Sequence, residues 1–266
     1  MRSVTFIPPQ VPASAKIPPA GELWIHQAKL DGFRCIAVKD GTKVRLYSRR
    51  GLEFRLPGMA AALANLAAHT AVLDTELIRV SPDGRADFFA LLRQMRQGKP
   101  DEEAMMLMAF DILCQDGVDL RDLALSERSR DLARLLRKSR VPCVKLIESF
   151  LDGTVLLDHC DRLGIEGVVS KRADKPYTSG PSKTWLKIKC DGWRRRNQYR
   201  YKLFEKPAKP PVPTERERIL QSRRDELARL QERMAEPERL RPSLAAAFKA
   251  QEGTLILEIA ELEAEF

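Results

Sequence analysis

Cysteine is scarce in this chain, and its placement argues against two common kinds of framework. The 266 residues include five cysteines, an odd number, and no two of them form a Cys-x-x-Cys pair. A disulfide scaffold or a structural zinc site needs paired or regularly spaced cysteines. We therefore expect free thiols in a reducing compartment. The cysteines lie at positions 35, 114, 143, 160 and 190.

Long hydrophobic runs are also missing. No apolar stretch reaches the roughly 18 residues that a membrane-spanning helix requires. The start of the chain, MRSVTFIPPQVP, lacks the apolar centre of a secretory signal. Together with the unpaired cysteines, these absences predict a cytoplasmic protein that makes no membrane contact.

Acidic residues are outnumbered, 37 Asp and Glu against 46 Lys and Arg, for a net charge of +9. Residues 215–266 hold nine basic and twelve acidic side chains, a balance of −3, so residues 1–214 carry +12. This excess favours a polyanionic partner, because each neutralised phosphate releases counterions. Charge alone leaves open a merely soluble basic protein.

A regular alternation of strands and helices is absent as well. The irregular mixture indicates an α+β fold of antiparallel sheets flanked by helices. Asp40-Gly41 predicts a hairpin, and the proline-rich residues 1–22 should lie extended over the surface. Further strands are expected at 71–80, 104–110, 144–150, 165–171 and 183–189, and helices at 57–68, 85–97, 126–138, 154–162, 215–236 and 255–266.

The pattern divides the chain into three parts. Residues 1–205 should form the main domain, 206–214 a stiff proline-rich linker, and 215–266 a helical C-terminal extension. The apolar faces of the extension could pack on the domain, on each other or against a partner, and the sequence does not decide among these.

Lys29 is the strongest candidate for covalent chemistry. It lies in the run Lys-Leu-Asp-Gly-Phe-Arg at residues 29–34. A lysine amine can attack a nucleotide α-phosphorus once its proton is gone and the phosphate charge is neutralised. Asp31-Gly32 would form a tight turn that presents the lysine, and Arg34 would donate to a ribose or phosphate oxygen. Taken alone, Asp-Gly is foremost a hairpin signal.

Five further motifs follow in order along the chain. They are Ser48-Arg49-Arg50-Gly51, Leu73-Asp74-Thr75-Glu76-Leu77, Phe110-Asp111-Ile112-Leu113, Glu166-Gly167-Val168-Val169-Ser170-Lys171 and Trp185-Leu186-Lys187-Ile188-Lys189. In this order they resemble the motifs of the ATP-dependent DNA ligases, and the approach at residues 24–27 is similar to that of bacterial end-joining ligase domains. The resemblance implies a nucleotidyltransferase (ATP-grasp-like) adenylation domain.

The resemblance also implies a reaction in three steps. Lys29 would attack ATP, expel pyrophosphate and keep AMP as a covalent lysyl-AMP. AMP would then pass to the 5′-phosphate of a nick in duplex DNA, and the 3′-hydroxyl would displace it. An ordinary lysine is protonated at neutral pH, so nearby cations must favour the free amine. Lys187 and Lys189, which share one strand face, would be catalytic by stabilising the phosphate charge.

Other matched positions take binding roles by the same resemblance. Phe110 would stack on adenine, although it could instead be a core phenylalanine. Glu76 and Glu166 would bind Mg²⁺ or Mn²⁺, since magnesium needs few protein carboxylates. Asp74 is a weaker candidate that could simply close a turn. The nucleotide-binding set is Gln27, Ala28, Arg34, Arg49, Glu76, Phe110 and Lys171, with Lys171 facing nucleotide phosphate or DNA.

A basic strip at residues 187–206 is the predicted DNA contact. It interleaves cations with Trp193, Tyr199, Tyr201 and Phe204, a pattern suited to phosphates and bases. The alternative is that these aromatic side chains pack on the main domain. The residues expected to touch DNA are Arg50, Arg194, Arg195 and Arg196.

Three features depart from the family pattern. Gln27 stands where relatives carry glutamate near the adenine amino group, but an amide oxygen still accepts that hydrogen bond. Thr75 replaces a glycine. No OB-fold domain is recognisable after the linker, and Arg223-Arg224-Asp225-Glu226 lies in a helical run and only superficially resembles the motif Arg-x-Asp-Lys. Slow self-adenylylation is therefore expected.

The sequence thus predicts a minimal ATP-dependent DNA ligase of DNA repair, monomeric, with a tail that could recruit a repair protein. Two other interpretations stay open. One is an RNA ligase or capping-type nucleotidyltransferase, which shares the lysine motif. The other is a non-catalytic or partly active protein that binds nicks or ends. The joint presence of Lys29, Glu76, Glu166, Lys187 and Lys189 weighs against a pure binder, which needs no such set.

Overall fold

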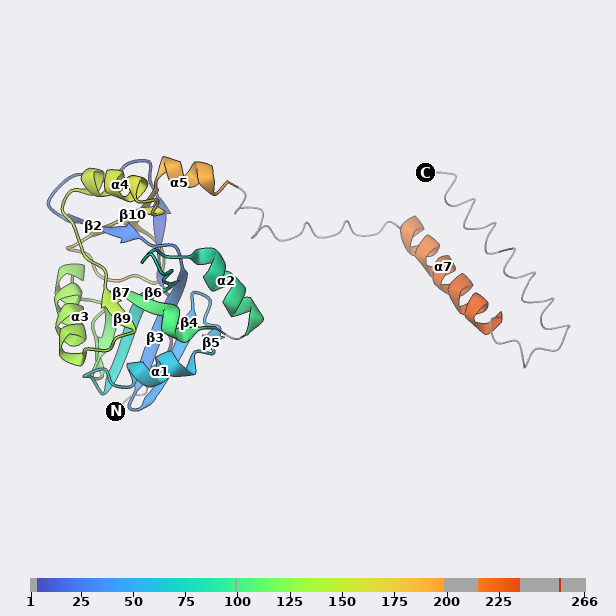
Figure 1. Cartoon of the computed structure of the whole chain (residues 1–266), viewed down its shortest axis with the longest axis horizontal. Coiled ribbons are helices and arrows are strands. Elements are labelled where there is room, and N and C mark those ends of the chain that lie inside the picture. Colours follow the sequence, from blue (N-terminus) through green and yellow to red (C-terminus); the bar gives the residue numbers. More distant parts are fainter. Residues whose placement is uncertain (1–3, 99, 199–214, 235–253, 255–266) are drawn as a thin grey trace. The chain divides into compact units, whose positions relative to one another are not determined.

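The computed structural model describes residues 4–98, 100–198, 215–234 and 254, and its strands form two sheets (Figure 1). The smaller sheet has the order β1-β11-β10-β2, and the larger has the path β5-β4-β3-β6-β7-β8 with β9 beside β7. The pairs β1–β11 and β7–β9 are parallel, and the other pairs are antiparallel. The expected α+β class is confirmed.

The strands occur where they were predicted, but β7 continues five residues beyond the strand expected at 104–110. The strand expected at 144–150 is shorter, because only residues 144–146 pair with β7. The strands are β1 Gln10–Ser14, β2 Trp24–Lys29, β3 Phe33–Asp40, β4 Lys43–Ser48, β5 Glu53–Phe54, β6 Thr70–Arg79, β7 Met105–Gln115, β8 Val118–Asp119, β9 Val144–Leu146, β10 Gly167–Arg172 and β11 Gly180–Lys189.

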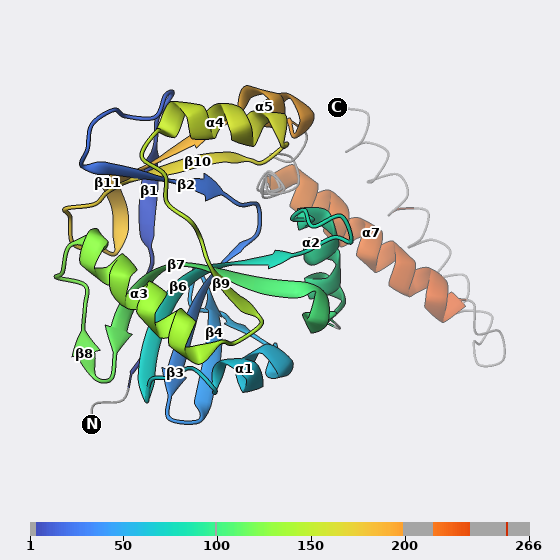
Figure 2. The same ribbon diagram turned by 60° about the vertical axis from the view of Figure 1, so that its left-hand side comes forward.

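Helices lie on the outer faces of both sheets. Helix α4 packs on β2 and β10, and α3 packs on β7 and β9 (Figure 2). The N-cap of α3 is Ala124, two residues before the predicted cap at Ser126. Helix α4 stops before Gly164, as expected. The bounds are α1 Pro57–Leu63, α2 Phe88–Gln97, α3 Leu125–Ser139, α4 Gly153–Arg162, α5 Asp191–Arg196 and α7 Glu215–Met234, with a 3₁₀ turn at Glu102–Ala104.

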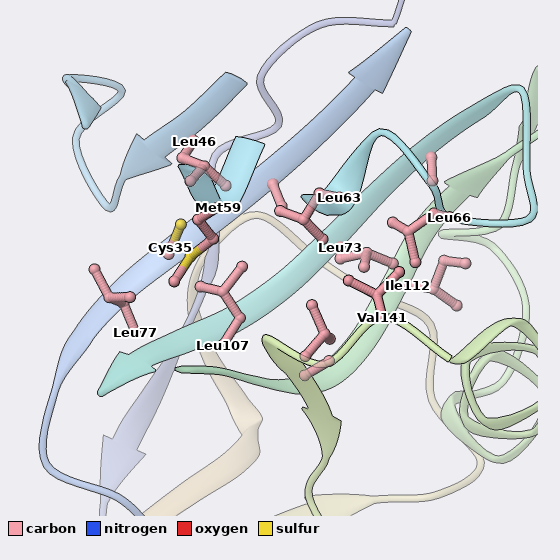
Figure 3. Packing of buried hydrophobic residues seen from close by; sticks show 14 of the residues in the cluster. Cys35, Leu46, Met59, Leu63, Leu66, Leu73, Leu77, Leu107, Ile112 and Val141 are labelled. Atoms are coloured by element: carbon pink, nitrogen blue, oxygen red, sulfur yellow. The ribbon is translucent and has the colours of Figure 1, made fainter. Parts of the chain in front are cut away.

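The larger sheet separates two apolar clusters. Successive strand residues point to opposite faces, and along β3 Cys35 and Ala37 join one cluster while Ile36 and Val38 join the other. The first cluster includes residues of α1, α2 and α3. Figure 3 shows part of its packing. The second includes Trp185 of β11, so it fills the space between the two sheets. A third, smaller cluster lies under α4 and α5.

The Asp31-Gly32 pair links the two sheets and forms no hairpin. Strand β2 belongs to the smaller sheet and β3 to the larger, so the chain crosses between layers immediately after Lys29. A Cβ on Gly32 would lie 2.2 Å from the carbonyl oxygen of Leu77. Glycine is therefore needed here for a close backbone approach. The hairpin expected at Asp40-Gly41 does form between β3 and β4, with Gly41 at φ +60°.

The N-terminal segment is more integrated than a surface strap. Residues 10–14 form β1, which pairs in parallel with β11, and Gln10 is fully buried. This differs from the expectation of a segment lying over the surface. A strand edge with unpaired backbone groups attracts such a segment, which accounts for the pairing.

The chain divides into two compact units, residues 1–198 and 199–266. In the second unit α7 covers the helix predicted at 215–236, and the linker at 206–214 and the segment at 255–266 lie outside the described residues. Among the described helices, none is both long enough and apolar enough to cross a membrane.

Candidate functional site

Three neighbouring strands place two of the predicted lysines in one row. Gly167 of β10 lies opposite Lys29 of β2 and opposite Lys189 of β11. Residues directly opposite one another point to the same face of a sheet. An added Cβ on Gly167 would lie 2.0 Å from the carbonyl oxygen of Ile188, so glycine permits the close contact of these strands.

Glu166 joins the two lysines. Its Oε2 lies 2.5 Å from Lys29 Nζ and its Oε1 lies 2.9 Å from Lys189 Nζ. The carboxylate side chain is 6% exposed and each lysine 23%. Burial by itself would raise the pKa of Glu166, but the two ammonium groups bring it below its ordinary value. The carboxylate therefore stays charged between the two lysines at neutral pH.

Lys187 completes a cationic group on the same face. It lies two residues before Lys189 on β11, opposite Val169. Burial, and then repulsion from Lys29, Lys189 and Arg49, lowers the pKa of Lys187. Lys29, Lys187 and Lys189 therefore lie near one carboxylate, with Arg49 near Lys187, a charge distribution that attracts a polyphosphate.

Glu76 brings a second carboxylate to this group from the larger sheet. It lies on β6 opposite Arg34 of β3. Burial raises the pKa of Glu76 to about 7, against the attraction of Lys29 and Arg34 and with the repulsion of Glu166. The site is thus formed between the sheets, from one side by β2, β10 and β11 and from the other by β6.

The two glutamates suit a cation carried by a phosphate. In the part of the chain that the structure describes, no three His, Cys, Asp or Glu side chains form a metal-binding group. Magnesium usually takes one or two protein carboxylates together with substrate phosphates. A cation beside Glu76 would favour the ionised form that burial disfavours. Glu76 and Glu166 therefore fit a nucleotide-bound Mg²⁺ or Mn²⁺.

Arg34 lies in a buried polar network. Its Nε and Nη2 donate to the carboxylate of Asp74, and its Nη2 also donates to the Gln10 carbonyl at 3.2 Å. Tyr177 Oη donates to Asp74 Oδ2 at 2.6 Å. Asp74 is fully buried in the middle of β6, so the expectation that it could close a turn is wrong. The guanidinium expected to meet the nucleotide is thus held by protein groups.

Phe110 and Lys171 lie against each other between the sheets. The Phe110 ring is 7% exposed, and Lys171 Nζ lies 4.2 Å from its centroid and 4.1 Å from that of Trp185. Lys171 is 2% exposed. This differs from the expectation that its amine faces phosphate or DNA, because it points into the aromatic cluster. Burial lowers the pKa of Lys171 to about 7.

Gln27 and Ala28 point in opposite directions from β2. Gln27 is buried, and its Nε2 donates to Ser149 Oγ at 3.0 Å. Ala28 packs against the cluster under α4, on the face away from Lys29. Its side chain therefore faces away from Lys29, so a contact of Ala28 with a nucleotide there would be made by its backbone.

The arginines predicted to contact DNA are exposed. Arg49 and Arg50 occupy the turn after β4, and Arg194, Arg195 and Arg196 lie in α5. Trp193 of the same helix is buried and packs under α4, which matches the alternative that the aromatic side chains of the strip join the domain. Tyr199, Tyr201 and Phe204 lie outside the described residues.

Sequence reasoning missed the groups that support the site. Arg128 forms a fully buried ion pair with Asp111, Nε to Oδ1 at 2.8 Å. One signal could have found it, since Arg128 falls three residues after Leu125 and four before Leu132, on the buried face of the helix. No local pattern marks Gln10 or Tyr177, because their partners are distant in sequence.

Comparison with known proteins agrees with this geometry. Residues 15–189, more than half of the chain, match the family described as ATP dependent DNA ligase domain. The multifunctional non-homologous end joining protein LigD of Pseudomonas aeruginosa is 36% identical over 188 residues, which are 70% of this chain and 22% of that protein. A DNA ligase of Methanoculleus marisnigri is 32% identical over 185 residues, 66% of this chain and 33% of that protein. The matched part of this chain spans about a fifth of the length of the first relative and about a third of the length of the second.

Solved structures show the same likeness. A mycobacterial DNA ligase D complexed with ATP and MES has a TM-score of 0.57 at 26% identity, covering 68% of this chain and 59% of that one. The ligase domain of LigD from M. tuberculosis has a TM-score of 0.56 at 25% identity, covering 68% and 60%. With two sheets that bring lysines and glutamates into one site, this chain belongs to the family of ATP-dependent DNA ligase domains.

Proposed function

We propose that the chain is an ATP-dependent DNA ligase that forms a lysyl-AMP on Lys29 and seals nicks in duplex DNA. The observation that carries the proposal is the convergence of Lys29, Lys189 and Glu166 within hydrogen-bonding distance, with Glu76 beside them. A protein that only binds DNA needs no buried carboxylate between two lysines. We also propose that residues 1–205 are the adenylation domain, 206–214 a linker and 215–266 an extension.

In the first step, Lys29 Nζ attacks the α-phosphorus of ATP, a P–N bond forms, and the bond to the β-phosphate oxygen breaks to release pyrophosphate. The attacking amine must be uncharged. Glu166 accepts a hydrogen bond from this amine at 2.5 Å. Lys187 and Lys189 then stabilise the charge that develops on the phosphate.

Glu76 and Glu166 would hold a Mg²⁺ or Mn²⁺ ion together with the ATP phosphates, and the ion would neutralise phosphate charge. Gln27 would accept a hydrogen bond from the adenine amino group through Oε1, since its Nε2 is used by Ser149. Phe110 would offer its ring to adenine, and Arg49 would contact AMP or the 5′-phosphate of the nick.

In the later steps AMP passes from Lys29 to the 5′-phosphate, and the 3′-hydroxyl displaces it to close the strand. Arg50, Arg194, Arg195 and Arg196 would bind the nicked duplex, since their side chains are exposed and cationic. We propose a cytoplasmic monomer that acts in DNA repair, with the extension as a docking segment for a repair protein.

The test is covalent labelling of the pure chain. Incubation with ATP labelled at the α-phosphate and with magnesium should label the wild type, and Lys29→Ala should abolish the label. Lys145→Ala is a matched control, because Lys145 is exposed on β9. Absence of label on the wild type, and of sealing on an already adenylylated nick, would refute the proposal. RNA nicks and labelled GTP separate it from RNA ligation and capping.

A further inference from the structure

Gln10 is a buried side-chain amide whose polar atoms all have partners. Its Nε2 donates to Ser182 Oγ at 3.2 Å and to Thr184 Oγ1 at 2.9 Å, and its Oε1 accepts from the backbone N–H of Thr178 at 2.8 Å. The residue is 0% exposed. These bonds tie β1 to β11 and to the segment that precedes β11.

The backbone of Gln10 reaches the network around Arg34. Its N–H donates to Tyr177 Oη at 2.9 Å, and its carbonyl accepts from Arg34 Nη2 at 3.2 Å. Tyr177 in turn donates to Asp74, the carboxylate that holds Arg34. Gln10 is therefore connected to Arg34 by a direct hydrogen bond and by a second path through Tyr177 and Asp74.

The side chain is what keeps this backbone in place. Strand β1 is short and lies at the edge of its sheet, and its pairing with β11 shifts register between Pro12 and Ala13. Backbone pairing with one neighbour leaves such an edge strand weakly held. The three bonds of the Gln10 amide fasten the N-terminal end of the strand, where the contacts with Tyr177 and Arg34 are made.

We propose that Gln10 is a positioning residue that fixes the Arg34 guanidinium for its contact with the nucleotide. The inference rests on the proposed function, in which Arg34 touches a ribose or phosphate oxygen. An arginine side chain has several rotatable bonds, and its use as a fixed donor depends on neighbours that hold it. Misplacement of a substrate-positioning group by about 1 Å can lower a rate about a hundredfold.

One substitution separates the hydrogen bonds of Gln10 from its volume. Gln10→Met keeps the size and removes the bonds, so kcat/KM for lysyl-AMP formation should fall about tenfold to a hundredfold. Gln115→Met, at the far end of β7, controls for the substitution itself.

The decisive experiment repeats Gln10→Met in an Arg34→Lys background. If Gln10 acts through Arg34, the second loss should largely disappear there. An equal loss in both backgrounds would overturn the proposal. Circular dichroism verifies folding at the assay temperature. Tyr177→Phe is a second variant should Gln10→Met fail to fold: it removes the indirect contact of Gln10 with Arg34 through Tyr177 and Asp74, and its loss should likewise shrink in the Arg34→Lys background.

The wild-type reaction keeps the two proposals apart. If the wild type forms no lysyl-AMP, the proposed function fails. If the wild type is labelled while Gln10→Met and Tyr177→Phe are labelled equally well, only the role of Gln10 fails.

Discussion

Replacing Lys171 with methionine should stabilise the folded protein at neutral pH. The lysine is 2% exposed, and its Nζ donates a long hydrogen bond to the Phe110 carbonyl at 3.5 Å. Burial lowers the pKa of Lys171 from 10.5 to about 7, with Asp111 opposing this and Arg34 adding to it. Between these two values the unfolded chain binds a proton that the folded protein lacks, which favours unfolding.

The size of the effect follows from that interval. At about 1.4 kcal/mol for each pH unit, the lowered pKa of Lys171 reduces the free energy of unfolding by at most about 5 kcal/mol. The contacts of the amine with the Phe110 and Trp185 rings offset about 1 to 2 kcal/mol of this. Methionine fills a similar volume and makes favourable contacts with aromatic rings. Lys171→Met should therefore raise the free energy of unfolding by about 2 to 4 kcal/mol at neutral pH.

The sign of the pH dependence gives a second check. Because the folded-state pKa lies below the unfolded one, wild-type stability should rise from about pH 7 to about pH 10, and the advantage of the variant should shrink. Urea unfolding followed by circular dichroism at both pH values measures this, with Lys145→Met as the exposed control. A variant no more stable than the wild type at neutral pH, or a difference that does not change with pH, would refute the reasoning.

Three other substitutions test separate parts of the structure. Arg128→Met should lower the free energy of unfolding by about 3 to 5 kcal/mol, because it leaves Asp111 buried without its partner; a urea midpoint close to wild type would contradict this. Gly167→Ala should lower the free energy of unfolding by about 2 to 4 kcal/mol, since its Cβ would meet the Ile188 carbonyl at 2.0 Å. It should also reduce labelling with ATP. Unchanged labelling and stability would show that β10 and β11 can separate freely. Burial raises the pKa of Glu76 from 4.5 to about 7, so the folded protein binds the extra proton in this interval and its stability falls as pH rises through it. Glu76→Gln should remove this dependence of stability on pH and should be more stable than the wild type at neutral pH. Urea unfolding of both proteins at pH 4.5 and at about pH 7 measures this. The same change in the free energy of unfolding with pH in both proteins would count against the prediction.

Several features of the site and of the fold could be predicted because they follow local rules. Lys187 and Lys189 alternate on a strand, so they share a face wherever that strand lies. Asp40-Gly41 closes a hairpin whose turn geometry depends on four residues. The α7 helix follows from apolar spacing along one segment. In each case the deciding interactions are between near neighbours in the chain.

At other positions a distant contact outweighed the local signal. Asp31-Gly32 carries the same hairpin signal as Asp40-Gly41, yet the chain crosses between sheets there because β2 pairs with β10. The Lys171 amine is drawn into an aromatic cluster formed by β7 and β11.

The sequence alone determined that the two lysines of β11 share a strand face, because strand period depends only on the chain itself, and its motifs predict that these lysines, Lys29 and the glutamates carry the chemistry. Only the tertiary structure decided which of them touch. Strands β2, β10 and β11 are far apart in sequence, and their register brings Lys29 and Lys189 to either side of Glu166. Long-range strand pairing sets that register, and no local pattern encodes it.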